Sequence, residues 1–174
     1  MNNDPMCTPY KMRASPVPHL TQEQITEIAM VYAKILGISK RTLRRIPEFV
    51  NFNLCKIAED LSVEPIDDEE WRQEWRGISN ASYDPKDLSI KMSENLYQNL
   101  MQGKPLSVSV FAHELGHYFL NHDLSTMHFA NIEVYGYCRE IDPEWQADTF
   151  AAVLCSIMGF DFYNCDSEQL SLFK

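Results

Sequence analysis

Several patterns that mark specialised classes of protein are missing from this chain of 174 residues. No apolar run approaches the roughly 18 to 20 residues of a membrane span, and the opening Met-Asn-Asn-Asp-Pro does not resemble a signal peptide. The five cysteines form no CxxC pair, and an odd number leaves one thiol over in any disulfide scheme. We therefore expect a cytoplasmic protein with reduced thiols and no membrane partner.

Basic charge is also scarce. The chain has 15 Lys and Arg against 25 Asp and Glu, and its formal net charge is -10. Such a field repels a phosphate backbone, which argues against direct binding of nucleic acid. The segment from Lys34 to Arg45 is locally basic, and it is either a solvated helix end and turn or a docking patch for an acidic partner.

The length and composition fit one folded domain, since 45% of the residues are hydrophobic and 23% are charged. Four prolines, Pro5, Pro9, Pro16 and Pro18, oppose regular structure near the start. We expect a flexible leader over 1–19, a domain over 20–160 and a C-terminal tail over 161–174.

Hydrophobic periodicity and capping residues predict the main elements of this domain. Helices are predicted over 21–36, 93–101, 106–121 and 143–158, with a further one that begins near Pro47. Residues 62–66 look extended, 67–70 form an acidic turn, and 77–83 and 88–92 form a hairpin around the turn 84–87. The fold class is therefore α+β, mainly helical, with a small antiparallel sheet.

The sequence His113-Glu114-Leu115-Gly116-His117 is a HExxH motif inside the predicted helix 106–121. Residues four apart lie on one side of a helix, so the two imidazoles can share one metal ion. Glu114 is rotated by about 100° from His113, where its carboxylate can act as a general base without being a ligand. Two imidazoles with room for a carboxylate and a water favour catalytic zinc, Zn2+, over a closed structural site.

A third zinc ligand is expected from the helix 143–158. Glu144 is the best candidate, although a carboxylate in a first helical turn can simply complement the helix dipole. Asp142 precedes Pro143 and is a less suitable substitute. Asp148 lies one turn after Glu144, where it can accept the outer N–H of a ligating histidine.

The remaining candidates have weaker sequence signals. His122 lies five positions after His117 and should point away from the ligand face, and His19 is in the leader, so we interpret both as ordinary polar residues. The connection 123–139 should border the cleft. It supplies four side chains that are either donors to an oxyanion or ordinary surface and core groups: His128, Tyr135, Tyr137 and Arg139.

Three blocks of the sequence resemble the ImmA/IrrE family of bacterial and phage-borne HExxH metallopeptidases. They are Lys56-Ile57-Ala58-Glu59-Asp60-Leu61-Ser62-Val63, Val110-Phe111-Ala112-His113-Glu114-Leu115-Gly116-His117-Tyr118-Phe119-Leu120, and Glu144-Trp145-Gln146-Ala147-Asp148-Thr149-Phe150-Ala151-Ala152-Val153-Leu154. In the family a glutamate that opens the third block is the third zinc ligand, which maps onto Glu144. Gln146 departs from the family, where a second glutamate is common at this position.

The resemblance implies a zincin-like metallopeptidase domain over 20–160 that cleaves a helix-turn-helix transcriptional repressor. Cleavage would derepress genes of a mobile element, such as a phage or an integrative element, or genes of a stress response. The alternative is a zinc-bearing binding module that sequesters a repressor or an antitoxin without cutting it. An intact Glu114 favours the peptidase, because a pure binder has no need of a carboxylate beside the metal.

Overall fold

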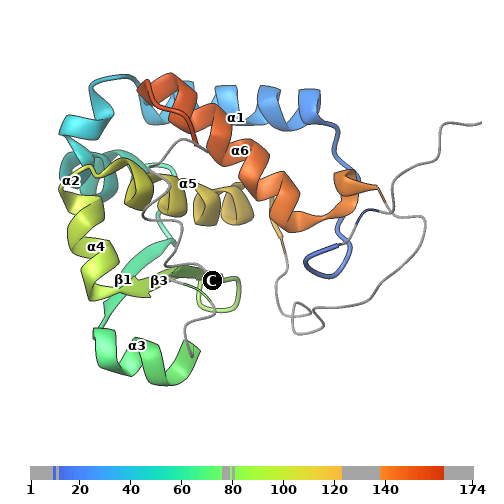
Figure 1. Cartoon of the computed structure of the whole chain (residues 1–174). Helices are drawn as coiled ribbons and strands as arrows, with labels where there is room; N and C mark the ends of the chain where they lie inside the picture. Colours follow the sequence, from blue (N-terminus) through green and yellow to red (C-terminus); the bar gives the residue numbers. More distant parts are fainter. Residues whose placement is uncertain (1–9, 11, 76–78, 80, 123–137, 163–174) are drawn as a thin grey trace, which may run out of the picture.

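A computed structural model of the chain describes Tyr10, Ser79 and the ranges 12–75, 81–122 and 138–162 (Figure 1). The described residues form an α+β fold with six α-helices and one three-stranded sheet. Figure 1 shows α1 (Gln22–Leu36) and α6 (Pro143–Met158) together on one side of α5 (Pro105–Phe119), with the sheet on the other side. Helix α5 is thus the central element, as its largely buried sequence requires.

The ends of the long helices follow from their capping residues. Thr21 and Gln24 form a complete capping box at the start of α1, and Gly37 ends that helix in the left-handed conformation. Helix α6 begins with Pro143 after the N-cap Asp142, and Gly159, with a φ of 94°, ends it. The predicted bounds 21–36 and 143–158 are confirmed to within a residue.

The sheet is mixed, which corrects the prediction of an antiparallel one. Strands β2 (Ala81–Asp84) and β3 (Ser89–Ser93) form the predicted antiparallel hairpin, whereas β1 (Ser62–Ile66) pairs with β3 in parallel. Helix α3 (Asp68–Trp75) and β2 lie between β1 and β3 in the chain, and this crossover lets β1 run in the same direction as β3. The strand order β1-β3-β2 leaves β2 at an edge.

Two further predictions differ from the structure. The acidic stretch 67–70, predicted as a turn, is the start of α3. Asp67 accepts hydrogen bonds from the backbone N–H groups of Glu69 and Glu70 and so caps this helix. The helix near Pro47 is short: α2 (Ile46–Glu48) continues as a π-helical turn over Phe49–Leu54. The basic side chains between Lys34 and Arg45 are exposed at the end of α1 and on the 3-10 turn Thr42–Arg44.

The core joins α5 to α6 through unusually close backbones. Phe111, Leu115 and Phe150 are almost fully buried between the helical layers, and α4 (Glu94–Met101) closes the core beside β3. A Cβ on Gly116 would lie 2.9 Å from the Cα of Ala147, so only glycine permits this approach. Among the described helices, none combines the length and the apolar character that a bilayer crossing requires.

The described part of the predicted leader packs against the start of α6. The backbone N–H groups of Val17 and Leu20 donate to the carbonyls of Ile141 and Glu140, in and beside the 3-10 turn η4 (Arg139–Ile141). Met12 and Ala14 are buried. These contacts place the leader beside the residues that the sequence nominates for metal binding.

Candidate metal centre

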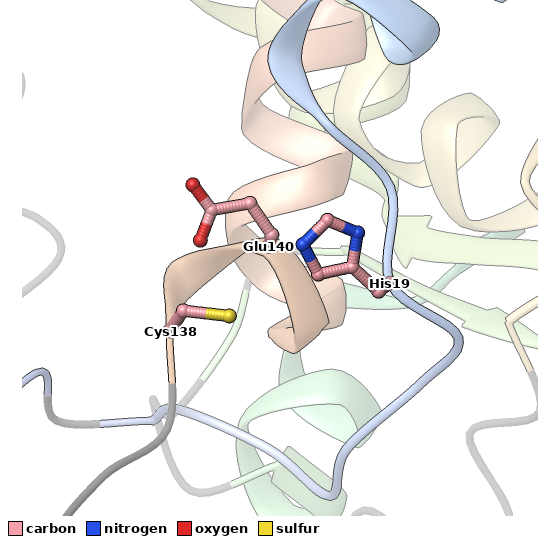
Figure 2. Close-up of side chains that lie close together, drawn as sticks. All are labelled: His19, Cys138 and Glu140. Carbon is pink, nitrogen blue, oxygen red and sulfur yellow. The ribbon is translucent and has the colours of Figure 1, made fainter.

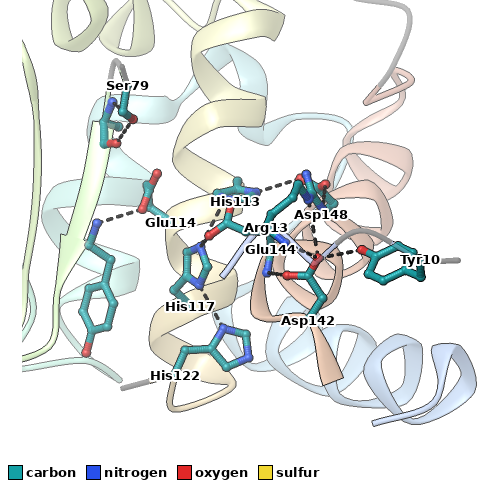
Figure 3. A network of polar contacts seen from close by, with 12 residues as sticks. Tyr10, Arg13, Ser79, His113, Glu114, His117, His122, Asp142, Glu144 and Asp148 are labelled. Atoms are coloured by element: carbon teal, nitrogen blue, oxygen red, sulfur yellow. Dashed lines mark hydrogen bonds and ion pairs between the residues drawn. The ribbon is translucent and has the colours of Figure 1, made fainter. Parts of the chain in front are cut away.

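Helices α5 and α6 bring His113, His117 and Glu144 together. The two histidines lie one turn apart near the end of α5, and Glu144 lies in the first turn of α6, held there by the Asp142 cap (Figure 3). Their ligand atoms all lie within 4.8 Å of one another, so the group can hold a metal ion. The sequence predicted these three residues as ligands, and the structure brings all three together.

The three residues form a triangle in which each side chain faces the other two at short distance. Nε2 of His113 lies 3.1 Å from Nε2 of His117 and 3.4 Å from Oε2 of Glu144, whereas Nε2 of His117 lies 3.5 Å from the other carboxylate oxygen, Oε1. A tetrahedral ion with bonds of about 2.0–2.1 Å requires ligand separations of about 3.3–3.4 Å. The side chains of His117, His113 and Glu144 are 3%, 17% and 25% exposed, so the triangle is closed behind His117 and open toward solvent beside Glu144.

Glu114 is held on the other side of the histidines, toward the sheet. Its Oε2 accepts a hydrogen bond of 2.8 Å from the backbone N–H of Tyr83 in the edge strand β2, which leaves its second oxygen available. The residue is only 6% exposed, and this burial raises the pKa of Glu114 to about 7. A carboxylate with such a pKa is suited to accept and return a proton near neutral pH.

Asp148 contacts His113 as its position on α6 predicted. Its Oδ1 lies 2.8 Å from Nδ1 of His113, and its Oδ2 accepts a 2.8 Å bond from the guanidinium of Arg13. Burial opposes the ionisation of Asp148, but the contacts with His113 and Arg13 prevail and hold its pKa below the usual range. A carboxylate at this nitrogen fixes the hydrogen of His113 on Nδ1 and directs Nε2 to the centre of the triangle.

The histidines differ in basicity. Burial disfavours the charge on His113, but its contacts with Asp148 and Glu144 outweigh that effect and raise the pKa of His113 to about 10. Burial and the neighbouring His113 lower the pKa of His117 well below its usual value. In the metal-free protein the positive charge at the centre is therefore a proton on His113. A metal ion that binds there would displace this proton.

The prediction that His122 points away from the ligand face is wrong, although His122 is not one of the three clustered residues. His122 is 2% exposed and its Nδ1 lies 2.9 Å from Nδ1 of His117. Helix α5 ends at Phe119, two residues before the predicted end, and Asn121 has a φ of 56°. This left-handed residue turns the chain back, so the helical rotation that seemed to carry His122 away does not apply.

Two residues of the leader also reach the site, and no sequence signal pointed to them. The hydroxyl of Tyr10 donates to Asp142 at 2.6 Å, and the backbone N–H of Arg13 donates to the same carboxylate. Asp142 is fully buried, and its carboxylate accepts hydrogen bonds from Tyr10, from Arg13 and from the first turn of α6. It is not one of the three residues of the triangle. Arg13 also reaches Asp148, which joins the leader to the partner of His113.

Of the four candidate oxyanion donors, only Arg139 is among the described residues. His128, Tyr135 and Tyr137 lie outside the described residues. The guanidinium of Arg139 lies 5.0 Å from the ring centre of Trp145 and its Nε lies 3.5 Å from Glu140. In the described part of the chain, Arg139 thus stacks on the outer side of α6 and gives no sign of an oxyanion contact.

A second group of possible ligands lies at the surface. His19, Cys138 and Glu140 also have ligand atoms within 4.8 Å of one another (Figure 2). His19 and Cys138 are exposed and Glu140 is half-buried. Within the residues that the structure describes, this group has no counterpart of the buried carboxylate and imidazole that orient His113 and His117, so it is the weaker of the two as a metal site.

Comparisons with family models, with curated proteins and with solved structures find no match to this chain. The functional assignment consequently depends on the geometry of the site and on the sequence blocks that resemble the ImmA/IrrE peptidases.

Proposed function

We propose that the chain is a zinc-dependent endopeptidase of the ImmA/IrrE type, which cleaves a helix-turn-helix repressor and so derepresses mobile-element or stress-response genes. The observation that supports the proposal is the triangle of His113, His117 and Glu144, whose nitrogen and oxygen atoms approach one another to 3.1–3.5 Å, close to the separations that tetrahedral zinc requires. The repressor as substrate follows from the resemblance of the three sequence blocks. The zincin-like character of the fold is part of the same proposal.

The chemistry of the donor set fits zinc. Imidazoles are borderline ligands that suit zinc, and zinc also accepts a carboxylate, whereas calcium and magnesium prefer shells made only of oxygen. When bound, zinc supplies a Lewis acid that lowers the pKa of a water molecule and polarises a carbonyl group. Asp148 and His122 hold the two imidazoles so that their Nε2 atoms converge.

Glu114 supplies the proton transfer. The N–H of Tyr83 holds one carboxylate oxygen, so the other oxygen is available to take a proton from a water molecule and to pass it to the leaving amine of the cut peptide. The bond to β2 fixes the direction of the carboxylate, and the burial of Glu114 keeps its basicity high. The residue therefore combines position and proton affinity.

Zinc content tests the ligands. Elemental analysis of the purified protein should find about one zinc per chain, and His113→Ala or His117→Ala should lose it. His19→Ala is the matched control, because it removes an exposed histidine from the surface group and should leave the zinc in place. Full zinc retention by both α5 variants would show that the ligand assignment is wrong.

Co-expression with a candidate helix-turn-helix repressor tests the reaction. Glu114→Gln keeps the size of the side chain and an oxygen for the Tyr83 N–H, so zinc and fold should persist while cleavage falls by about 10² to 10⁴. Glu74→Gln, on the exposed side of α3, is the control. If derepression is unaffected by Glu114→Gln and mass spectrometry finds no repressor fragment with the wild type, the protein sequesters the repressor without cutting it.

A further inference from the structure

A chain of buried hydrogen bonds leads from His117 through His122 to Gln146. Nδ1 of His117 lies 2.9 Å from Nδ1 of His122, and Nε2 of His122 lies 2.9 Å from Oε1 of Gln146. All three residues are at most 2% exposed. The distances alone do not say which ring nitrogens carry hydrogen. The hydrogen bonds of Gln146, at the far end of this series, decide it.

The amide of Gln146 has a single possible orientation. Its Nε2 lies 2.9 Å from the carbonyl of Pro18 and 2.7 Å from the carbonyl of Glu140. Carbonyl oxygens only accept, so both N–H groups of the amide point to them and Oε1 faces His122. The flipped amide would set an oxygen against two carbonyl oxygens.

The hydrogens of the histidines follow in order. An amide oxygen only accepts, so Nε2 of His122 carries a hydrogen, and Nδ1 of the neutral ring has a free lone pair. Since two lone pairs cannot face each other across 2.9 Å, Nδ1 of His117 must carry the hydrogen that it donates to Nδ1 of His122. Nε2 of His117 is then left with its lone pair, directed at the centre of the ligand triangle.

We propose that Gln146 and His122 form a relay that fixes the tautomer of His117 and holds its Nε2 lone pair ready for the metal. Gln146 is thus a positioning residue for the metal centre, although two hydrogen bonds, through His122, separate it from the ligand His117. The relay is uncharged, in contrast to the carboxylate of Asp148 that orients His113. One ligand is therefore directed by an anion and the other by neutral groups.

The relay also links the centre to the leader. The Gln146 amide holds together the Pro18 carbonyl, the Glu140 carbonyl and His122, which come from three separate segments of the chain. The pairing of Val17 and Leu20 with η4 supports the same arrangement. Docking of residues 17–20 is consequently part of what fixes the tautomer of His117.

The tautomers can be read directly from the metal-free, full-length wild type. Long-range ¹H–¹⁵N correlation spectra distinguish a ring nitrogen that carries hydrogen from one with a free lone pair. We expect His122 to carry its hydrogen on Nε2 and His117 to carry its hydrogen on Nδ1. A His122 ring with its hydrogen on Nδ1 would overturn the proposal, and this result does not depend on whether the protein binds zinc.

Variants then test what the relay does for the metal. The proposal depends on the zinc site proposed above, and affinity is measured by competition with a chromogenic chelator. His122→Leu and Gln146→Met should each weaken zinc binding by about 10- to 100-fold, as is typical for partners that orient a metal ligand. Gln98→Met, at an exposed position of α4, is the control and should leave the affinity unchanged.

A conservative variant separates the hydrogen bond from packing. His122→Asn keeps an acceptor near the position of Nδ1 but is smaller than Leu, so it should lie closer to the wild type in zinc affinity than His122→Leu. Wild-type affinity in both His122→Leu and Gln146→Met would overturn the relay. If the wild type itself binds no zinc, the proposed function fails, whereas the tautomers of the metal-free protein still decide the relay.

Discussion

The close approach of α5 and α6 at Gly116 makes a quantitative prediction about the metal centre. In Gly116→Ala the new Cβ would lie 2.9 Å from Cα of Ala147 and 3.1 Å from its carbonyl oxygen. Carbon atoms pack at about 3.5–4.0 Å, so the helices must separate by about 0.6 Å or more. Both contacts are backbone atoms, which cannot rotate away as a side chain would.

This separation acts directly on the ligands. Gly116 is adjacent to His117, and Ala147 is one turn from Glu144, so the displacement reaches the edges of 3.4 and 3.5 Å between the two helices. Metal sites tolerate about 0.2 Å. The metal-free protein can relax, but the zinc-bound protein must restore the short distances and accept the strain of overpacking, about 1–3 kcal/mol. Zinc affinity should therefore fall by roughly 5- to 150-fold.

Stability and affinity should respond differently. In the metal-free Gly116→Ala protein the helix propensity of Ala, about 1 kcal/mol better than that of Gly, offsets part of the overpacking, so the loss of stability should be about 0–2 kcal/mol. Ile46→Val in α2, away from the site, should lower the stability by about 0.5–1.5 kcal/mol and leave zinc affinity unchanged. Thermal unfolding and chelator competition measure the two quantities. Wild-type zinc affinity in Gly116→Ala would refute the argument.

Three further outcomes test the surroundings of the ligands. Glu144→Ala should lose zinc while Asp142→Asn, which alters the cap of α6 and the contacts with Tyr10 and Arg13 but no proposed ligand, should keep it; the opposite pattern in elemental analysis would identify Asp142 as the ligand. Asp148→Asn should weaken zinc binding by about 10- to 100-fold in chelator competition, because the amide no longer holds the His113 ring as a carboxylate does, and an unchanged affinity would count against that role. The pKa of His113 is raised to about 10, so this ring is protonated at pH 8 and zinc must displace that proton. Calorimetry in buffers of different ionisation enthalpy should record release of at least about one proton at pH 8, with affinity falling as the pH falls, and an absence of proton release would contradict the account.

Local rules in the sequence were enough to predict the bounds of α1 and α6. The capping box at Thr21, the proline at 143 and the glycines at 37 and 159 act within one or two turns, and the structure confirms the helix bounds that they predict. The spacing of His113 and His117 likewise depends only on helix geometry. The relation of Glu144 to Asp148 is of the same kind, since both lie on one face of α6.

Local rules could not predict the contacts between segments that lie far apart in the sequence. The parallel pairing of β1 with β3, the bond from the Tyr83 backbone to Glu114 and the leader contacts of Tyr10 and Arg13 join parts of the chain that no local pattern connects. They depend on which surfaces pack together. The mixed sheet, in particular, follows from the crossover through α3, which periodicity does not describe.

His122 shows most clearly where the two kinds of information separate. The sequence by itself determined that two imidazoles and the carboxylate of Glu114 share one turn of a helix, because that follows from 3.6 residues per turn. Only the tertiary structure decided which groups orient those imidazoles, because one left-handed residue, Asn121, turns the chain and buries His122 between His117 and Gln146. A helix repeats its geometry at every residue, whereas the place where it stops and the direction in which the chain leaves depend on what it packs against.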